Sequence, residues 1–95
     1  MDEDNFYKLL EELKKNNQAL KSDLKISEFF DVFSHQSTFR LYDLEAMLNL
    51  EKNDVRTLVN FLMRSRMVAS TGSGYKKTQR FNAFISRAFK EGLIS

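Results

Sequence analysis

The chain has 95 residues and a net charge of +2, and 42% of its residues are hydrophobic, nine of them phenylalanine. This composition suits one small globular domain and is too apolar for a disordered chain. There is no cysteine, which excludes disulfides and thiolate metal sites, and no apolar run approaches the roughly 18 residues that a membrane-spanning helix needs. We therefore expect a cytoplasmic protein with no membrane partner.

The charge is unevenly distributed along the chain. Residues 1–50 carry a net charge of −4, whereas residues 51–95 carry +6. A basic half is the electrostatic footprint of a polyanionic partner such as nucleic acid. A solvated basic surface with no partner gives the same count, so the charge alone leaves both interpretations open.

Residues 4–20 are predicted to form an N-terminal helix, with acidic residues at its positive end. Apolar residues recur along it at alternating spacings of four and three, and Asn17 occupies one of these positions. This spacing is typical of a coiled-coil seam in which a buried asparagine fixes the register. In the alternative, Phe6, Leu10 and Leu13 pack on their own domain and the helix ends near Asn17. Because fewer than three clean heptads are present, we expect packing with partial dimer contact.

A second helix is predicted around residues 23–35. Its core face consists of four apolar residues at helical spacing: Ile26, Phe29, Phe30 and Phe33. Residues 37–40 follow as a short β-rich stretch. We expect this stretch to pair with a later hairpin and to place Phe39 in the core.

Residues 43–70 form the most informative segment, because their apolar positions repeat twice at helical spacing around a polar break. The two stripes are Leu44, Met47 and Leu48, then Val55, Leu58, Val59 and Leu62. This pattern predicts a helix, a tight turn containing Leu50, and a second helix. The segments 67–70, 71–74 and 75–81 then read as a strand, a glycine turn and a basic strand.

This order of elements resembles the winged helix-turn-helix family of small bacterial and archaeal transcriptional regulators. The resemblance is carried by acidic, turn and apolar positions: Asp43, Leu44, Leu48, Asn49, Leu50, Val55, Val59, Leu62, Met67 and Val68. Glu45 and Glu51 replace small residues of the family pattern, and Arg66 replaces its usual glycine. The resemblance implies a mainly α fold with a small β-hairpin. We expect a single winged-helix domain over residues 1–95, with its core at 23–81 and extra helices at 4–20 and 82–92.

In this family the second helix of the pair, here residues 53–66, enters the major groove of double-stranded DNA. With the apolar stripe facing inward, helical geometry turns a polar set outward: Asn53, Arg56, Thr57, Asn60 and Arg64. Arginine can contact guanine, asparagine can contact adenine, and threonine can reach a phosphate or a thymine methyl group. The alternative is an ordinary solvated face. Glu51 and Asp54 count against DNA unless they cap the helix or accept a hydrogen bond from cytosine.

The basic wing, residues 70–81, is predicted to contact the DNA backbone or the minor groove. Strand alternation puts Lys76, Thr78 and Arg80 on one face and Tyr75, Lys77, Gln79 and Phe81 on the other. We expect Lys76, Lys77 and Arg80 to neutralise phosphates. Basic residues also protect exposed edge strands from aggregation, which is the alternative interpretation.

The last helix is predicted over residues 82–92, with Asn82 as its N-cap and Gly92 as its stop signal. The two terminal helices carry more apolar surface than one winged domain needs. We therefore expect a homodimer whose interface contains Phe6, Leu10, Leu13, Phe84 and Phe89. Ordinary core packing is the alternative.

Catalytic chemistry has little support in the sequence. His35 is the only histidine, and no catalytic motif or phosphate-binding loop occurs. We expect no catalytic residue, no metal, no cofactor and no small-molecule ligand. The predicted function is sequence-specific DNA binding by a small transcriptional regulator. The alternative is a winged-helix protein-interaction module in a larger transcription or replication assembly, which the acidic residues Glu51 and Asp54 favour.

Overall fold

The computed structural model describes residues 1–94, in which five α-helices accompany a small three-stranded antiparallel sheet. In chain order the elements are α1 (Glu3–Asn16), the 3-10 helix η1 (Gln18–Leu20), α2 (Asp23–His35), β1 (Thr38–Phe39), α3 (Leu41–Leu48), α4 (Lys52–Arg64), β2 (Val68–Ser70), β3 (Tyr75–Lys77) and α5 (Gln79–Lys90). The predicted mainly α fold with a β-hairpin is therefore confirmed.

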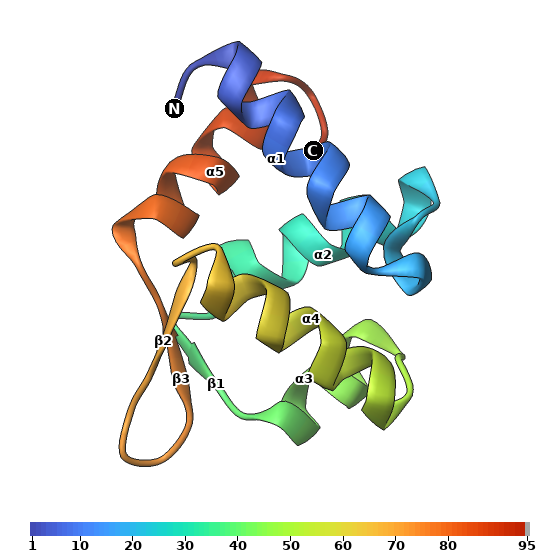
Figure 1. The fold of residues 1–95 in the computed structure, drawn as a ribbon, viewed down its shortest axis with the longest axis vertical. Coiled ribbons are helices and arrows are strands. Elements are labelled where there is room, and N and C mark those ends of the chain that lie inside the picture. The colour runs from blue at the N-terminus through green and yellow to red at the C-terminus, as the bar shows by residue number, and fades with distance from the viewer. Residues whose placement is uncertain (95) are drawn as a thin grey trace.

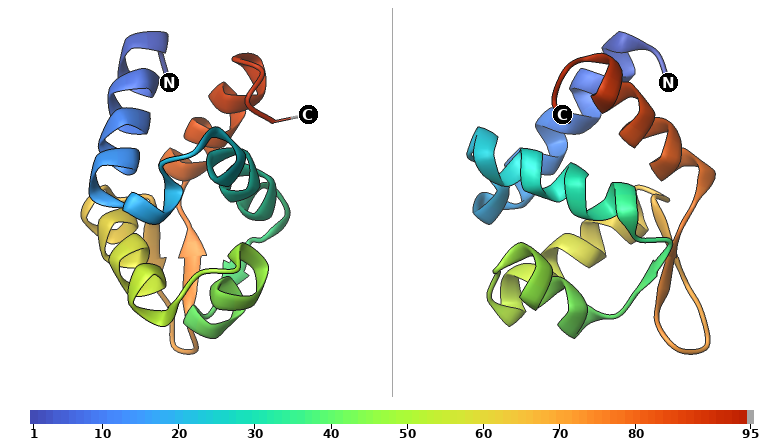
Figure 2. Two further views of the ribbon diagram at one scale, coloured as in Figure 1. Left: turned by 90° about the vertical axis from the view of Figure 1, so that its right-hand side faces the viewer. Right: turned by 180° about the vertical axis from the view of Figure 1, so that it is seen from behind.

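The helices are arranged around α2, which crosses the middle of the molecule (Figure 1). The terminal helices α1 and α5 contact each other at one end, while α3 and α4 contact each other at the other end. The hairpin of β2 and β3 projects beyond α3 and α4, and Figure 2 shows the same arrangement from two further sides. No helix within residues 1–94 combines the length and the apolar character that crossing a membrane requires.

The sheet has the order β1-β3-β2, so the second hairpin strand is central. Thr38 of β1 pairs with Lys76, and Val68 of β2 pairs with Lys77. The predicted pairing of residues 37–40 with the hairpin is confirmed, and Phe39 is buried. A Cβ atom at Gly74 would lie 2.6 Å from the Phe39 carbonyl oxygen, so the close approach of β1 to the hairpin requires glycine there.

The core centres on phenylalanines that α1, α2 and α5 contribute to one aromatic cluster. Ring centroids are 5.2 Å apart for Phe6 and Phe84, 6.4 Å for Phe6 and Phe30, and 4.9 Å for Phe33 and Phe81. These separations are within the range in which aromatic pairs attract each other. The terminal helices are therefore part of the fold's own core, and the predicted core face of α2 is confirmed.

The coiled-coil alternative for the first helix is not supported, whereas the packing alternative, with the helix ending near Asn17, is confirmed. α1 ends at Asn16, and Asn17 leaves the helical conformation with φ −134° and ψ 86°. The buried Asn17 amide donates a hydrogen bond to the Leu13 carbonyl, 2.9 Å away, so this side chain ends a helix within the chain. Leu24, which would continue the spacing of four and three beyond Asn17, lies on α2 with 69% of its surface exposed.

The expectation that the apolar residues of the terminal helices lack inner partners is also wrong. Phe6, Leu10, Leu13 and Phe84 are at most 7% exposed within a single chain. They are buried within the single chain, so a dimer interface would need other side chains. Of the five residues predicted at a dimer interface, only Phe89 is substantially exposed, at 49%.

The boundary between the hairpin and the last helix also differs from the prediction. β3 ends at Lys77, and α5 begins at Gln79 with Thr78 as its N-cap, whose hydroxyl accepts a hydrogen bond from the Phe81 amide. Asn82, the predicted cap, lies inside the helix. The predicted stop is confirmed, because Gly92 has a φ of +79° just after the helix end.

Candidate nucleic-acid interface

The helix pair α3 and α4 is joined by a three-residue turn whose first residue, Asn49, adopts the left-handed conformation with φ 51°. Leu50 then packs against the core, as predicted, and its amide donates a hydrogen bond to the Glu45 carbonyl, 3.2 Å away. Glu51 occupies the N-cap position of α4, but its side chain makes no capping hydrogen bond. The predicted helix, turn and helix are therefore confirmed.

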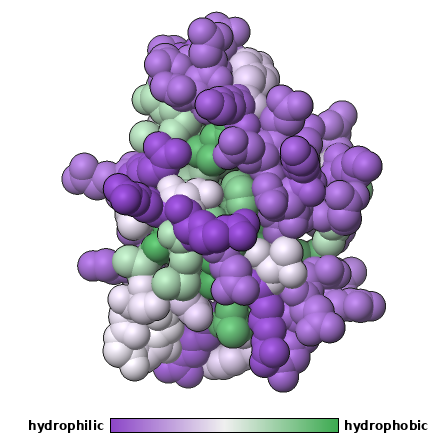
Figure 3. All heavy atoms as spheres, in the orientation of Figure 1, coloured by the Kyte–Doolittle hydropathy of each residue, from purple (hydrophilic) through white to green (hydrophobic). Residues whose placement is uncertain are grey.

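The two faces of α4 are those that the sequence predicts. The inner stripe of Val55, Leu58, Val59 and Leu62 is at most 2% exposed. All five side chains predicted to point outward are exposed: Asn53, Arg56, Thr57, Asn60 and Arg64. Figure 3 shows a largely hydrophilic surface on this side of the molecule, where α4 lies in front. The outward orientation of these five side chains is confirmed, and their contact with DNA stays a prediction.

Phe61 interrupts the polar character of α4 without being exposed. Its side chain is 4% exposed and lies one turn after Leu58, and α4 also contacts α1. The Arg64 guanidinium lies 6.0 Å from the Phe61 ring centroid, within the range of a cation–π contact. The N-terminal helix thus covers one flank of α4 and leaves the outer face open.

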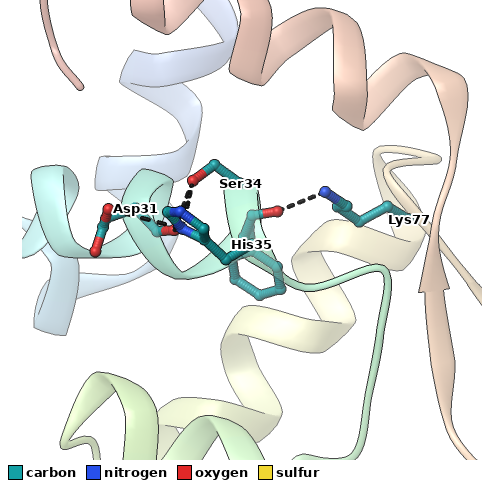
Figure 4. Close-up of polar contacts among 5 residues, drawn as sticks. Asp31, Ser34, His35 and Lys77 are labelled. Carbon is teal, nitrogen blue, oxygen red and sulfur yellow. Dashed lines mark hydrogen bonds and ion pairs between the residues drawn. The ribbon is translucent and has the colours of Figure 1, made fainter. Parts of the chain in front are cut away.

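The two lysines of β3 have different surroundings. Lys76 is exposed, whereas Lys77 is partly buried and its ammonium donates a hydrogen bond to the Phe33 carbonyl in the last turn of α2 (Figure 4). Burial lowers the pKa of the Lys77 ammonium. The alternation along the strand is as predicted, but the inner face meets the end of α2. The contact of Lys77 with a phosphate stays a prediction, and its bond to the Phe33 carbonyl counts against it.

Arg80 lies on α5 rather than on a strand of the wing. Its Nε atom donates a hydrogen bond to the Ser65 carbonyl at the end of α4, 2.8 Å away, and its side chain remains exposed. The prediction of Arg80 on a strand face is therefore wrong, although the residue still lies beside α4. The hairpin loop, residues 71–74, carries no charged side chain.

The ion pairs of residues 1–94 all lie outside this region. They join Lys14 to Asp23, Lys25 to Glu28, His35 to Asp31, and Arg87 to both Glu3 and Glu91, at separations of 3.3–3.9 Å. No lysine or arginine between residues 51 and 81 forms an ion pair with a carboxylate of residues 1–94. The positive charge around α4 is consequently not neutralised within this part of the chain.

Two further basic residues at this surface were missing from the predicted site. Lys52 begins α4 and Arg66 follows its end, and both are exposed. Arg66 could have been found from the sequence, because it occupies the position where the family pattern has glycine. Within residues 1–94, no group of three or more histidine, cysteine or carboxylate side chains is placed to hold a metal ion.

Comparison of the chain with known protein families, with curated protein sequences and with solved structures finds no match. The resemblance to the winged helix-turn-helix family therefore stays a prediction. The functional proposal depends on the geometry of α4 and its surroundings.

Proposed function

We propose that the protein is a winged helix-turn-helix domain that binds double-stranded DNA with sequence specificity as a small transcriptional regulator. The order α2, β1, α3, α4, β2, β3 supports this proposal, because it is the order of elements in a winged domain. In this description α1 and α5 are additions at either end. The observation that carries the proposal is the outer face of α4, which combines exposed arginine and amide side chains with the absence of ion-pair partners among the described residues.

The outer face of α4 suits the chemistry of base edges. The thirteen residues of α4 form a helix about 20 Å long, and the major groove admits one α-helix. Arg56 can donate two hydrogen bonds to guanine, and Asn60 can bond adenine through both its amide atoms. The Thr57 hydroxyl already donates to the Asn53 carbonyl, 3.0 Å away, so Thr57 would contribute its methyl group.

The other basic side chains would position the protein on the DNA rather than recognise its sequence. Three exposed basic residues are candidates: Arg64 at the end of α4, Lys76 on β3, and Arg80 on α5, which donates to the Ser65 carbonyl at the end of α4. Contacts from such residues to phosphates add affinity for every sequence alike.

Selection of bound sequences from random duplex DNA, followed by alanine substitution, tests the proposal. Arg56→Ala and Asn60→Ala should each lose about 1–3 kcal/mol on the selected site and relax base preference there. Lys76→Ala is the matched control and should weaken all sequences similarly. Equal loss on every sequence from Arg56→Ala would show that α4 does not read bases.

The alternative is a winged-helix protein-interaction module with weak or no DNA binding. Three observations favour it: the exposed carboxylate of Glu51 at the start of α4, the uncharged hairpin loop, and the inward orientation of Lys77. The same selection distinguishes the two functions, because an interaction module would enrich no duplex sequence even in dilute buffer.

A homodimer remains part of the proposal, with two copies of α4 about one DNA turn apart and a palindromic site. Since the core residues of α1 and α5 are buried, the dimer would use the exposed apolar side chains, among them Phe89. Sedimentation equilibrium at micromolar concentration measures the state directly. A monomer that Phe89→Asp leaves unchanged would remove both the dimer and the palindrome.

A further inference from the structure

Within residues 1–94, three helices are followed by a residue in the left-handed conformation. The residues are Asn49 after α3 with φ 51°, Arg66 after α4 with φ 60°, and Gly92 after α5 with φ 79°. Glycine adopts this conformation without steric cost, and asparagine tolerates it better than other residues with a side chain. Arginine has neither property, so the end of α4 carries a strain that the other two helix ends avoid.

The backbone hydrogen bonds at the end of α4 do not require an arginine at position 66. The Met67 amide donates to the Leu62 carbonyl at 2.8 Å, and the Arg66 amide donates to the Met63 carbonyl at 3.0 Å. The same pair of bonds closes α5 around Gly92, with Leu93 bonded to Ala88 at 2.9 Å and Gly92 bonded to Phe89 at 3.1 Å. Both ends are Schellman motifs, in which glycine is the usual left-handed residue.

The Arg66 side chain also has no structural partner in the described part of the chain. It is exposed, and its guanidinium makes no hydrogen bond or ion pair with residues 1–94. Its two arginine neighbours do have such contacts, since Arg64 lies over the Phe61 ring and Arg80 donates to the Ser65 carbonyl. The Thr78 hydroxyl, 2.7 Å from the Arg66 carbonyl, holds the strained backbone in place.

We propose that Arg66 binds a phosphate group of the DNA backbone at the C-terminal end of α4, with Arg64 and Arg80 beside it. This inference rests on the proposed function and adds a contact that the sequence pattern did not assign. The planar guanidinium presents a fork of donors that matches two phosphate oxygens. A strained backbone conformation at a residue whose exposed side chain has no contact within the fold is explained if that side chain binds a partner.

The substitution Arg66→Gly separates stability from binding, because the two should change in opposite directions. Removing the strain should raise the midpoint of thermal unfolding by roughly 4 °C. Removing the guanidinium should weaken binding to duplex DNA about 5- to 10-fold and make the slope of log K against log salt shallower by about one unit. Arg66→Lys keeps a charge and the strain, and should lose less affinity without gaining stability.

Lys90→Gln is the matched control, because Lys90 is an exposed base on α5 away from this corner. It removes the same charge and should leave the salt slope unchanged. If Arg66→Gly binds DNA as the unmodified protein does, with the same salt slope, the phosphate contact is overturned while the proposed function stands. If the unmodified protein binds no DNA in dilute buffer, the proposed function and this inference both fail.

Discussion

The pair α1 and α5 and the outer face of α4 are both rich in charge, but the charges are used differently. Arg87 is 19% exposed and lies 3.7 Å from a Glu3 oxygen and 3.6 Å from a Glu91 oxygen, so it joins the two terminal helices. The arginines of α4 have no carboxylate partner within residues 1–94. A charge paired inside the fold contributes to stability, whereas an unpaired exposed charge is free to attract a partner. The proposed binding surface therefore depends on where each basic side chain lies rather than on the net charge.

Truncating a buried phenylalanine of α1 should give the largest loss of stability, and it tests whether the terminal helices belong to the core of one chain. Phe6 is fully buried against Phe30 and Phe84, and Phe6→Ala should lower the free energy of unfolding by about 3–5 kcal/mol. Leu24→Ala is the control, because the Leu24 side chain on α2 is 69% exposed, and it should cost less than about 1 kcal/mol. Urea unfolding measures both. A cost for Phe6→Ala that grows with protein concentration would instead indicate a dimer contact.

The second effect tests the different roles of the two neighbouring lysines of β3. Lys77→Ala removes a charged donor from the end of α2 and should lower the free energy of unfolding by about 1–2 kcal/mol. Lys76→Ala removes an exposed charge, so it should leave stability within about 0.5 kcal/mol and weaken DNA binding. Thermal unfolding and a binding titration on both variants check this. Equal stabilities would contradict the inward orientation of Lys77.

The smallest effect concerns the contact between Tyr7 and Glu91. The hydrogen bond to Glu91, followed by burial, raises the pKa of the Tyr7 phenol above its ordinary value of 10.0. The fold thus favours the neutral phenol, and the unfolded chain ionises first as the pH rises. The stability from this group is fully present below pH 10 and is lost as the pH rises through the folded pKa. Between roughly pH 9 and 11, the Tyr7→Phe variant should therefore lose less free energy of unfolding than the unmodified protein. Urea titrations at each pH measure this difference. Parallel pH profiles of the two proteins would refute the contact.

The long helices could be predicted from the sequence because each gives several turns of apolar periodicity. The bounds of α2 and the inner and outer faces of α4 follow from residues such as Phe29, Phe33, Val55 and Leu62. In both helices the apolar stripe is matched by a polar stripe, so only one orientation buries the first and exposes the second.

The boundary near Thr78 could not be predicted in the same way. A strand of three residues is too short to show a period, and both Thr78 and Asn82 are good helix caps. Contacts that are distant in sequence select between them, since the Thr78 hydroxyl reaches the Arg66 and Met67 carbonyls. Arg80 was misplaced on a strand face for this reason.

Whether the terminal helices pack within one chain or between two chains could not be predicted from the sequence, for another reason. The apolar pattern of Phe6, Leu10 and Leu13 indicates that these side chains are buried, but it does not tell whether the covering surface belongs to the same chain. The answer depends on α2 and α5 presenting Phe30 and Phe84 to the same space. The strain at Arg66, by contrast, was signalled by a single departure from the family's glycine.

We propose that the unpaired basic side chains around α4 bind the DNA backbone, and the salt dependence of the affinity for DNA measures this binding. Each phosphate contact contributes about −0.9 to the slope of log K against log salt, so contacts from Arg64, Arg66, Lys76 and Arg80 predict a slope of about −3 to −4 per bound chain. Fluorescence anisotropy with a labelled duplex measures this slope. A flat salt response, or no binding in dilute buffer, would contradict the claim and favour a protein partner for this surface.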